Sequence, residues 1–297
     1  LIEKGLENNT DFRTAHLRVQ EAEAALMTSR LAYLPALNLT PQGTISSFDG
    51  SKAAKSYQLA ASASWEIDIF GRLTNAKRSA QAALEQTKSY KQAVRTQLIA
   101  TIANSYYTLL LLDKQLVISE RTASLWKENV QAMQALKKAG LTNEAAVSQS
   151  EANCLSVEAS LLTLRQQINE MENSLSNLLG EVPQRVERGN LDCQEFPETL
   201  STGVPLALLG NRPDVRQAEY SLAQAFYTTN GARSAFYPNI NLSGVAGWTN
   251  SGGGIIANPG GLLLQAIGSL TQPLFNRGVN IANLKIAKSR QEEAKLL

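Results

Sequence analysis

The chain has 297 residues, of which 43% are hydrophobic and 18% charged, a balance typical of a folded protein rather than a disordered one. Its formal net charge of +2 comes from interspersed acidic and basic residues, without the single-sign block that binds nucleic acid or an acidic membrane surface. One histidine, His16, and two distant cysteines, Cys154 and Cys193, exclude the usual metal and redox motifs, and no run of eighteen apolar residues predicts a membrane-spanning helix.

The pattern of residues 1–36 predicts a helix that ends before Pro35, because a residue that precedes a proline is disfavoured in the helical backbone conformation. Residues 37–69 then predict a first pair of strands. Apolar side chains occupy alternate positions in both strands, a period that sends one set of side chains to each face of a sheet. The alternating apolar residues are Leu37, Leu39 and Ile45 in the first strand, and Tyr57, Leu59, Ala61, Ala63, Trp65, Ile67 and Ile69 in the second.

Residues 71–180 predict one long antiparallel helical hairpin. Neither glycine nor proline, the two strongest helix breakers, occurs between Gly71 and Gly140 or between Gly140 and Gly180. A helix through the first stretch would span about 100 Å at about 1.5 Å per residue, which is too long for a compact domain. Gly140 suits a helix C-cap and Thr142 or Asn143 an N-cap, so we expect the two helices to fold back on each other.

The second helix of this hairpin carries apolar residues in two columns with a spacing of seven, which is the pattern of coiled-coil a and d positions. Such columns pack against a partner helix, so we expect them to form the seam of the hairpin. The predicted seam consists of Val147, Cys154, Leu161, Ile168 and Leu175 in one column and Val157, Leu164, Met171 and Leu178 in the other.

The chain repeats itself after an irregular segment at residues 181–204. Residues 30–35 match residues 233–238, and Phe70-Gly71-Arg72 matches Phe275-Asn276-Arg277. The second copy therefore predicts a helix at 205–236, a second strand pair at 238–273 and the start of a second long helix at 275–297. Because this copy stops soon after its long helix begins, we expect the natural protein to contain a second hairpin that matches residues 72–180.

The strand patterns favour a membrane. A strand of about 13 residues with one apolar and one polar face suits a tilted strand between lipid and water. The residues that we expect to face lipid are Tyr57, Leu59, Trp65, Ile67, Leu242 and Trp248. Four strands are too few to close a spanning barrel, so several chains would share one. The alternative is a soluble sheet that buries one face against the helices.

Each copy of the repeat has the same order of elements: a helix, a Tyr-Leu-Pro or Phe-Tyr-Pro sequence, a strand pair, and a Phe-Gly-Arg or Phe-Asn-Arg turn into a long helix. This order resembles that of the TolC family of outer-membrane efflux proteins. Residues 211–219, NRPDVRQAE, are similar to the signature with which that family begins its second repeat. The resemblance covers essentially the whole chain, and it is strongest to the branch that serves resistance-nodulation-division pumps.

The resemblance implies a mainly α-helical fold with a membrane β part. Helices 1–36 and 205–236 would enter a twelve-stranded barrel shared by a homotrimer, hairpin 71–180 would line a periplasmic tunnel, and residues 181–204 would form an equatorial belt. A periplasmic adaptor protein would dock at the hairpin tip, which consists of Lys138, Gly140, Leu141, Thr142 and Asn143. In the family an Asp usually precedes the residue that matches Val147, where this chain has Ala146.

The function implied is a passive outer-membrane exit duct for small molecules, with an inner-membrane transporter as energy source and no cofactor, metal or nucleic acid. Two alternatives share parts of this pattern: a periplasmic adaptor or structural coiled-coil protein, and a type I protein-secretion conduit. An enzyme is disfavoured, because His16 has no partner at a catalytic spacing. Glu66 and Asp68 are expected to be polar residues of a water-lined barrel wall.

Overall fold

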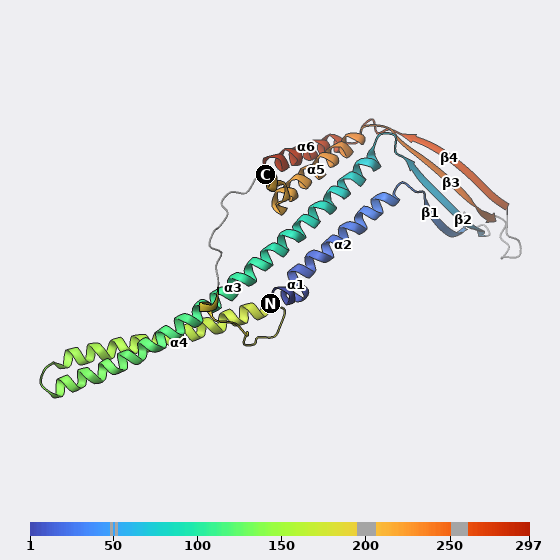
Figure 1. Cartoon of the computed structure of the whole chain (residues 1–297). Coiled ribbons are helices and arrows are strands. Elements are labelled where there is room, and N and C mark those ends of the chain that lie inside the picture. Colours follow the sequence, from blue (N-terminus) through green and yellow to red (C-terminus); the bar gives the residue numbers. More distant parts are fainter. Residues whose placement is uncertain (48–49, 51–52, 195–205, 251–260) are drawn as a thin grey trace. The chain divides into compact units, whose positions relative to one another are not determined.

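The computed structural model describes residues 1–47, 50, 53–194, 206–250 and 261–297 (Figure 1). The chain divides into two compact units, the first formed by Leu1–His16 and Lys91–Pro205 and the second by Leu17–Tyr90 and Leu206–Leu297. Helices α2 (Thr10–Leu31) and α3 (Arg72–Lys138) contribute residues to both units.

The first unit contains the hairpin that the absence of glycine and proline predicts. Helix α3 runs for 67 residues without a break, about 100 Å at about 1.5 Å per residue, and α4 (Glu144–Leu178) follows it. The two helices are antiparallel, since later residues of α3 pair with earlier residues of α4 (Figure 1). The pairs are Glu120 with Arg165, Lys127 with Glu158 and Gln134 with Glu151.

The hairpin turns at Gly140, which has a φ of +74°. The amides of Gly140 and Leu141 donate to the carbonyls of Lys137 and Leu136, each at 3.0 Å, and so satisfy two carbonyls that the end of α3 leaves free. The Asn143 side chain accepts from the amide of Ala146 at 3.0 Å and caps α4. Of the two expected N-caps, Thr142 and Asn143, the structure uses Asn143.

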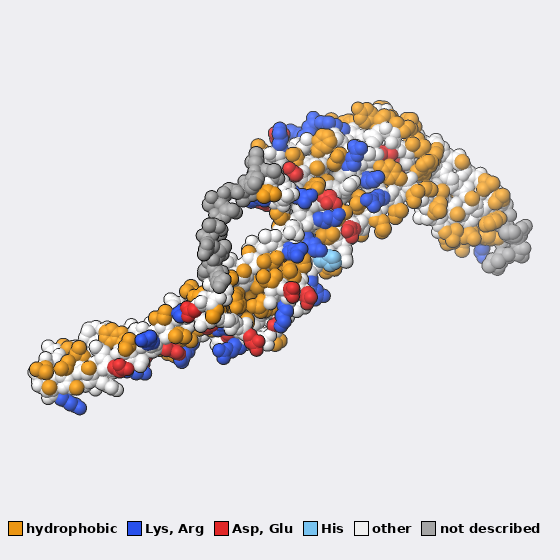
Figure 2. All heavy atoms as spheres, viewed as in Figure 1, with side chains coloured by type: hydrophobic (Ala, Val, Ile, Leu, Met, Phe, Trp, Pro, Cys, Tyr) orange, Lys and Arg blue, Asp and Glu red, His pale blue; other side chains and the backbone are white. Residues whose placement is uncertain are grey.

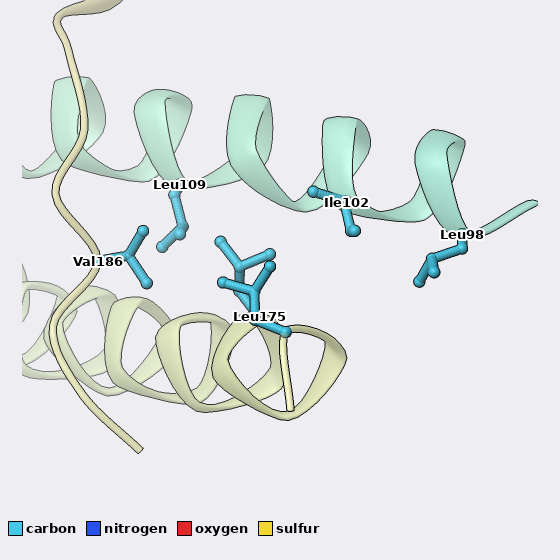
Figure 3. Close-up of a cluster of buried hydrophobic side chains, with 6 residues drawn as sticks. Leu98, Ile102, Leu109, Leu175 and Val186 are labelled. Atoms are coloured by element: carbon cyan, nitrogen blue, oxygen red, sulfur yellow. The ribbon is translucent and has the colours of Figure 1, made fainter. Parts of the chain in front are cut away.

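The core of this unit joins three segments that are far apart in the chain. Leu98, Ile102 and Leu109 of α3 meet Leu175 and Leu179 at the end of α4 and Val186 beyond it (Figure 3). Leu109 and Leu175 are completely inaccessible to solvent. Residues 179–194, the described part of the segment after α4, are therefore held against the hairpin by apolar packing, and the short 3-10 helix η1 (Leu191–Cys193) lies among them.

Residues 2–31 form two helices rather than one. Asn9, whose backbone is extended, separates α1 (Ile2–Asn8) from α2. The buried side chain of Asn9 accepts from the amide of Phe12 at 3.0 Å and donates to the carbonyl of Leu178 at 3.1 Å. One asparagine thus caps α2 and binds a helix end that lies 169 residues away.

The second unit packs helices beside a sheet. Val19 and Leu26 of α2 and Leu84 of α3 form a buried cluster, and α5 (Pro213–Ser234) packs on α6 (Val279–Leu296). The Thr229 hydroxyl donates to the Ala287 carbonyl at 3.2 Å between these two helices. The short 3-10 helix η2 (Leu206–Asn211) precedes α5, and part of the segment expected at 181–204 lies outside the described residues.

The sheet has four antiparallel strands in the order β1-β2-β3-β4 (Figure 1). They are β1 (Ala36–Ser46), β2 (Ala54–Ile67), β3 (Asn239–Asn250) and β4 (Gly261–Thr271). Our expectation that the second strand reaches Ile69 was wrong, because Asp68 caps α3 instead. Its carboxylate accepts from the amides of Leu73 and Thr74 and from the Thr74 hydroxyl. Burial would raise the pKa of Asp68, but these hydrogen bonds lower it below its ordinary value.

Strands β2 and β3 approach most closely at Gly247. A β-carbon placed on this glycine would lie 2.2 Å from the Leu59 carbonyl oxygen and 2.6 Å from the Ala60 α-carbon. Both obstacles are backbone atoms, which cannot move aside without distorting the strand. We therefore expect Gly247→Ala to destabilise the sheet by about 1–3 kcal/mol, the usual range for overpacking.

Gly244→Ala on the same strand is the matched control, because its nearest obstacle would be at 3.8 Å. The measurement is the unfolding midpoint of the detergent-solubilised protein, followed by tryptophan fluorescence, to which Trp65 and Trp248 on this sheet contribute. Equal midpoints for the two variants would contradict the close approach.

Candidate functional site

The sheet has one apolar and one polar face. The register sets Leu59 opposite Trp248 and Trp65 opposite Leu242, so all four side chains share a face. The outer strands continue the same face, since Leu39 lies opposite Ala61 and Leu264 opposite Ala246. The large apolar residues on this face are Leu37, Leu39, Ile45, Tyr57, Leu59, Trp65, Ile67, Ile240, Leu242, Trp248, Leu262, Leu264 and Leu270.

No described element covers this face, which we call the apolar face. Leu39 is 70% exposed and Leu264 71%. Figure 2 shows hydrophobic side chains spread over the visible surface of the sheet. Soluble proteins rarely leave so continuous an apolar surface uncovered. The alternative of a sheet that buries its apolar face against its own helices is therefore wrong for the described residues.

The height of the apolar face can be estimated from β2. The ten residue steps from Tyr57 to Ile67 cover about 33 Å along the strand, or about 25 Å at the tilt of about 40° that is usual in membrane barrels. Aromatic residues lie toward both ends of this span. Tyr57 and Trp248 are at the loop end, and Trp65 at the helix end donates its indole N–H to the Tyr33 carbonyl at 2.8 Å. A band of this height with aromatic borders matches the hydrocarbon layer of a membrane.

The opposite face, which we call the polar face, carries hydroxyl and amide side chains. They are Asn38, Thr40, Gln42, Thr44, Ser56, Gln58, Ser62, Ser64, Asn241, Ser243, Thr249, Gln265 and Ser269. Glu66 is the charged residue among the paired β2 residues of this face, and it binds Arg72, whose Nε lies 2.6 Å from the carboxylate. This face is therefore hydrophilic and nearly uncharged.

The structure changes one expectation about these faces and extends the apolar face to β4. Asp68, which we expected on a barrel wall, is a helix cap outside the strand. β4, whose alternation is weak in the sequence, nevertheless sets Leu262, Leu264 and Leu270 on the apolar face. Its pattern is obscured because Leu263 and Ile267 are apolar residues on the polar face.

The tip of the hairpin is exposed and tightly turned. Leu141 is 75% exposed at the outermost turn, and Lys138, Gly140 and Asn143 are also exposed while Thr142 is half-buried. Lys137 and Glu144 form an ion pair across the base of the turn. The tip thus presents an apolar side chain on a hydrogen-bonded turn, a combination that suits contact with a protein partner.

The heptad columns of α4 lie at or near the helix contact. Val147, Cys154 and Leu175 are buried, and the other predicted seam residues are half-buried: Val157, Leu161, Leu164, Ile168, Met171 and Leu178. Ile168, Met171 and Leu178 pack against the core cluster of the first unit.

An ion-pair cluster around Arg188 escaped the sequence analysis. Its guanidinium binds both carboxylate oxygens of Asp113 in α3, at 2.5 and 2.8 Å, and also binds Glu172 in α4. Arg188 is 8% exposed and Glu172 10%. Hydrogen bonds to Asp113 and Glu172 raise the pKa of Arg188 above its ordinary value. No spacing signal was available, because the partners lie 75 and 16 residues away.

Two other features are absent from the described ranges. No group of three or more His, Cys, Asp or Glu side chains lies close enough to hold a metal ion there. None of the described helices has an apolar stretch long enough to carry it across a bilayer.

Comparisons with known proteins agree with this geometry. The sequence pattern of the family described as outer membrane efflux protein matches residues 1–181 and 204–296. The cation efflux system protein CusC of Escherichia coli K12 is 30% identical over 301 residues, which cover 99% of this chain and 65% of CusC. The solvent efflux pump outer membrane protein SrpC of Pseudomonas putida is 27% identical over 300 residues, 98% of this chain and 64% of SrpC.

A solved structure shares the fold. The open state of the MtrE outer membrane channel of Neisseria gonorrhoeae superposes with a TM-score of 0.87 at 29% identity, covering 99% of this chain and 67% of MtrE. The chain thus spans slightly less than two thirds of the length of CusC and SrpC.

Proposed function

Because the chain belongs to the outer membrane efflux protein family, we propose that it is the outer-membrane channel of a tripartite efflux pump, a passive exit duct for small molecules. The apolar face of the sheet carries this proposal. It is exposed, about as high as a bilayer core, and backed by a face of hydroxyl and amide groups that suits a water-filled lumen. A duct of this kind needs no catalytic group, and we propose that the chain is not an enzyme.

The partners follow from the same geometry. Four strands per chain leave both edges of the sheet open, so we propose that three copies share a barrel of twelve strands in the outer membrane. We propose that the tip at Lys138, Gly140, Leu141, Thr142 and Asn143 meets a periplasmic adaptor protein, which connects the channel to an inner-membrane transporter. The exposed Leu141 and the well-capped turn support this docking site.

The polar face indicates which class of solute the proposed channel would let through. Its side chains are mainly Ser, Thr, Asn and Gln, and Glu66 is paired with Arg72. Such a wall would select by size more than by charge. The relatives are named for different solutes, cations for CusC and solvents for SrpC, and this chain's substrate is proposed only as a small molecule.

The test is export by the natural protein in a strain that lacks its own outer-membrane channels. We expect the protein to restore growth in the presence of toxic small molecules when a matching adaptor and transporter are present, and to form steady conductance steps in planar lipid bilayers. Extraction from membranes by salt or alkali alone, with no conductance, would refute the channel.

The rival adaptor function predicts one hairpin and a compact sheet that needs no detergent. The four-stranded sheet formed by both strand pairs, with its exposed apolar face, argues against it. A type I secretion conduit shares the fold, and copurification of the inner-membrane transporter would distinguish it from a small-molecule duct.

A further inference from the structure

We propose that the cavity at the helix end of the sheet is a solute-binding site, which takes an uncharged, ring-shaped molecule with hydroxyl groups, such as a glycoside. The cavity lies on the polar face, which we assign to the lumen, so this inference rests on the proposed channel and deepens it. It names a class of solute that would bind to the wall of the duct during its passage.

The cavity lies where the strands of the sheet meet the helices. It has a volume of about 430 Å³ and is bounded by the ends of β2, β4 and α5 and by the starts of β3, α3 and α6 (Figure 1). Four of its lining residues belong to the polar face: Glu66, Asn239, Asn241 and Thr271. Small-molecule sites usually have volumes of about 300–1,000 Å³, so the cavity can hold a small solute.

Several polar groups in this cavity have no partner among the described residues. The side-chain amides of Asn239 and Asn241 are half-buried, and neither forms a hydrogen bond within the described ranges. The Tyr237 hydroxyl is equally free there. Arg72 binds Glu66 through Nε and Nη2, which leaves Nη1 available. Amides and hydroxyls both donate and accept, and the guanidinium donates, so a solute with several hydroxyl groups can satisfy them together.

The charged groups of the cavity are already paired, which disfavours an ionic solute. Both carboxylate oxygens of Glu66 accept from Arg72. The Asp68 carboxylate accepts three hydrogen bonds at the start of α3, and the positive end of the helix dipole offsets part of its charge. An organic cation or anion would therefore have to compete with these contacts, whereas a neutral solute leaves them intact.

Two aromatic rings give the cavity a flat apolar wall. Phe70 stacks on Tyr237 with ring centroids 5.1 Å apart and planes 7° apart, and both residues line the cavity. The two side chains remain 40% and 54% exposed. The flat face of a phenyl or sugar ring can pack against such a surface while its polar groups bind the free amides.

The repeat indicates that some of these groups are not required by the fold. The positions that match Tyr237 and Asn239 in the first copy are Leu34 and Ala36. The first copy nevertheless forms the same helix-to-strand turn, between α2 and β1. A phenol and an amide that the turn does not need, and that face one cavity, support a role in binding.

The test measures the binding of three probes to the natural protein in lipid nanodiscs by equilibrium dialysis, with empty nanodiscs as the baseline. Phenyl β-D-glucoside is the neutral probe. Phenyltrimethylammonium and benzenesulfonate carry the same ring with a positive or a negative charge. We expect saturable binding of the glucoside, tighter than that of either charged probe by a factor of about ten or more, because only the glucoside satisfies the free polar groups.

Two variants and one control locate the binding. Asn241→Ala removes one free amide, and Tyr237→Leu gives this position the residue that the first copy has. Asn38→Ala is the matched control, because Asn38 is the repeat equivalent of Asn241 and also lies on the polar face, but does not line the cavity. We expect the first two substitutions to weaken glucoside binding about tenfold and Asn38→Ala to leave it unchanged. Conductance steps of each protein in planar bilayers test the channel separately.

Equal glucoside binding by the Asn241→Ala and Asn38→Ala variants, tighter binding of a charged probe, or no saturable glucoside binding would each overturn the solute site. Normal conductance in the same preparations would leave the channel standing. A protein that neither binds the glucoside nor conducts would overturn both proposals.

Discussion

Leu39→Arg on β1 is expected to prevent the protein from assembling in the outer membrane. Leu39 is 70% exposed on the apolar face and lies opposite Ala61, near the middle of the apolar span of β2. A charged side chain at the centre of a lipid-facing strand costs about 2–4 kcal/mol. This cost would recur in every copy of the oligomer, so three copies would lose about three times as much.

Thr40→Arg is the matched control, because Thr40 is the next residue of the same strand and is also exposed, but lies on the polar face. The measurement is the fraction of protein that forms heat-modifiable oligomers in isolated outer membranes. We expect a loss of more than tenfold for Leu39→Arg and little change for Thr40→Arg. If Thr40→Arg is the more damaging substitution, the assignment of the two faces is reversed.

Arg188→Met is expected to destabilise the first unit by about 3–5 kcal/mol, because it leaves the buried carboxylate of Glu172 without its partner. The Asp113 carboxylate is 37% exposed, and water would solvate it in the variant. Most of the loss in the free energy of unfolding should therefore come from Glu172. The double variant Arg188→Met with Glu172→Met removes both buried charges. It should therefore be more stable than Arg188→Met alone.

Lys114→Met provides the comparison with a surface ion pair. Lys114 binds Asp192 at 2.5 Å, but both side chains are well exposed, so this pair should contribute at most about 1 kcal/mol. Unfolding of each variant in urea, followed by circular dichroism at 222 nm, gives the free energies. Equal losses for Arg188→Met and Lys114→Met would show that the Arg188 cluster is not a stabilising centre.

Much of the fold was predictable because its signals are local. The length of α3 follows from the absence of glycine and proline between Gly71 and Gly140, since each residue in between can adopt helical geometry without breaking the hydrogen-bond ladder. The two faces of β2 follow from strict alternation, because successive side chains of a strand point to opposite sides. The turn at Gly140 follows from a residue that tolerates positive φ.

The errors in the prediction occurred where a polar side chain had two possible partners. Asp68 continues the alternation of β2 but lies within reach of the free amides at the start of α3, and the cap prevails. Asn9 has no proline or glycine beside it, yet it ends α1 because its side chain binds the end of α4. Such choices depend on which other segment is nearby.

The sequence by itself therefore determined the long helical hairpin, the two strand pairs, the repeat and the two faces of β2, because these depend on residues a few positions apart. Only the tertiary structure decided the strand register, the close approach at Gly247, the Arg188 cluster and the break at Asn9. The contacts that create these features join residues tens to hundreds of positions apart, and no periodicity along the chain records which distant groups will meet.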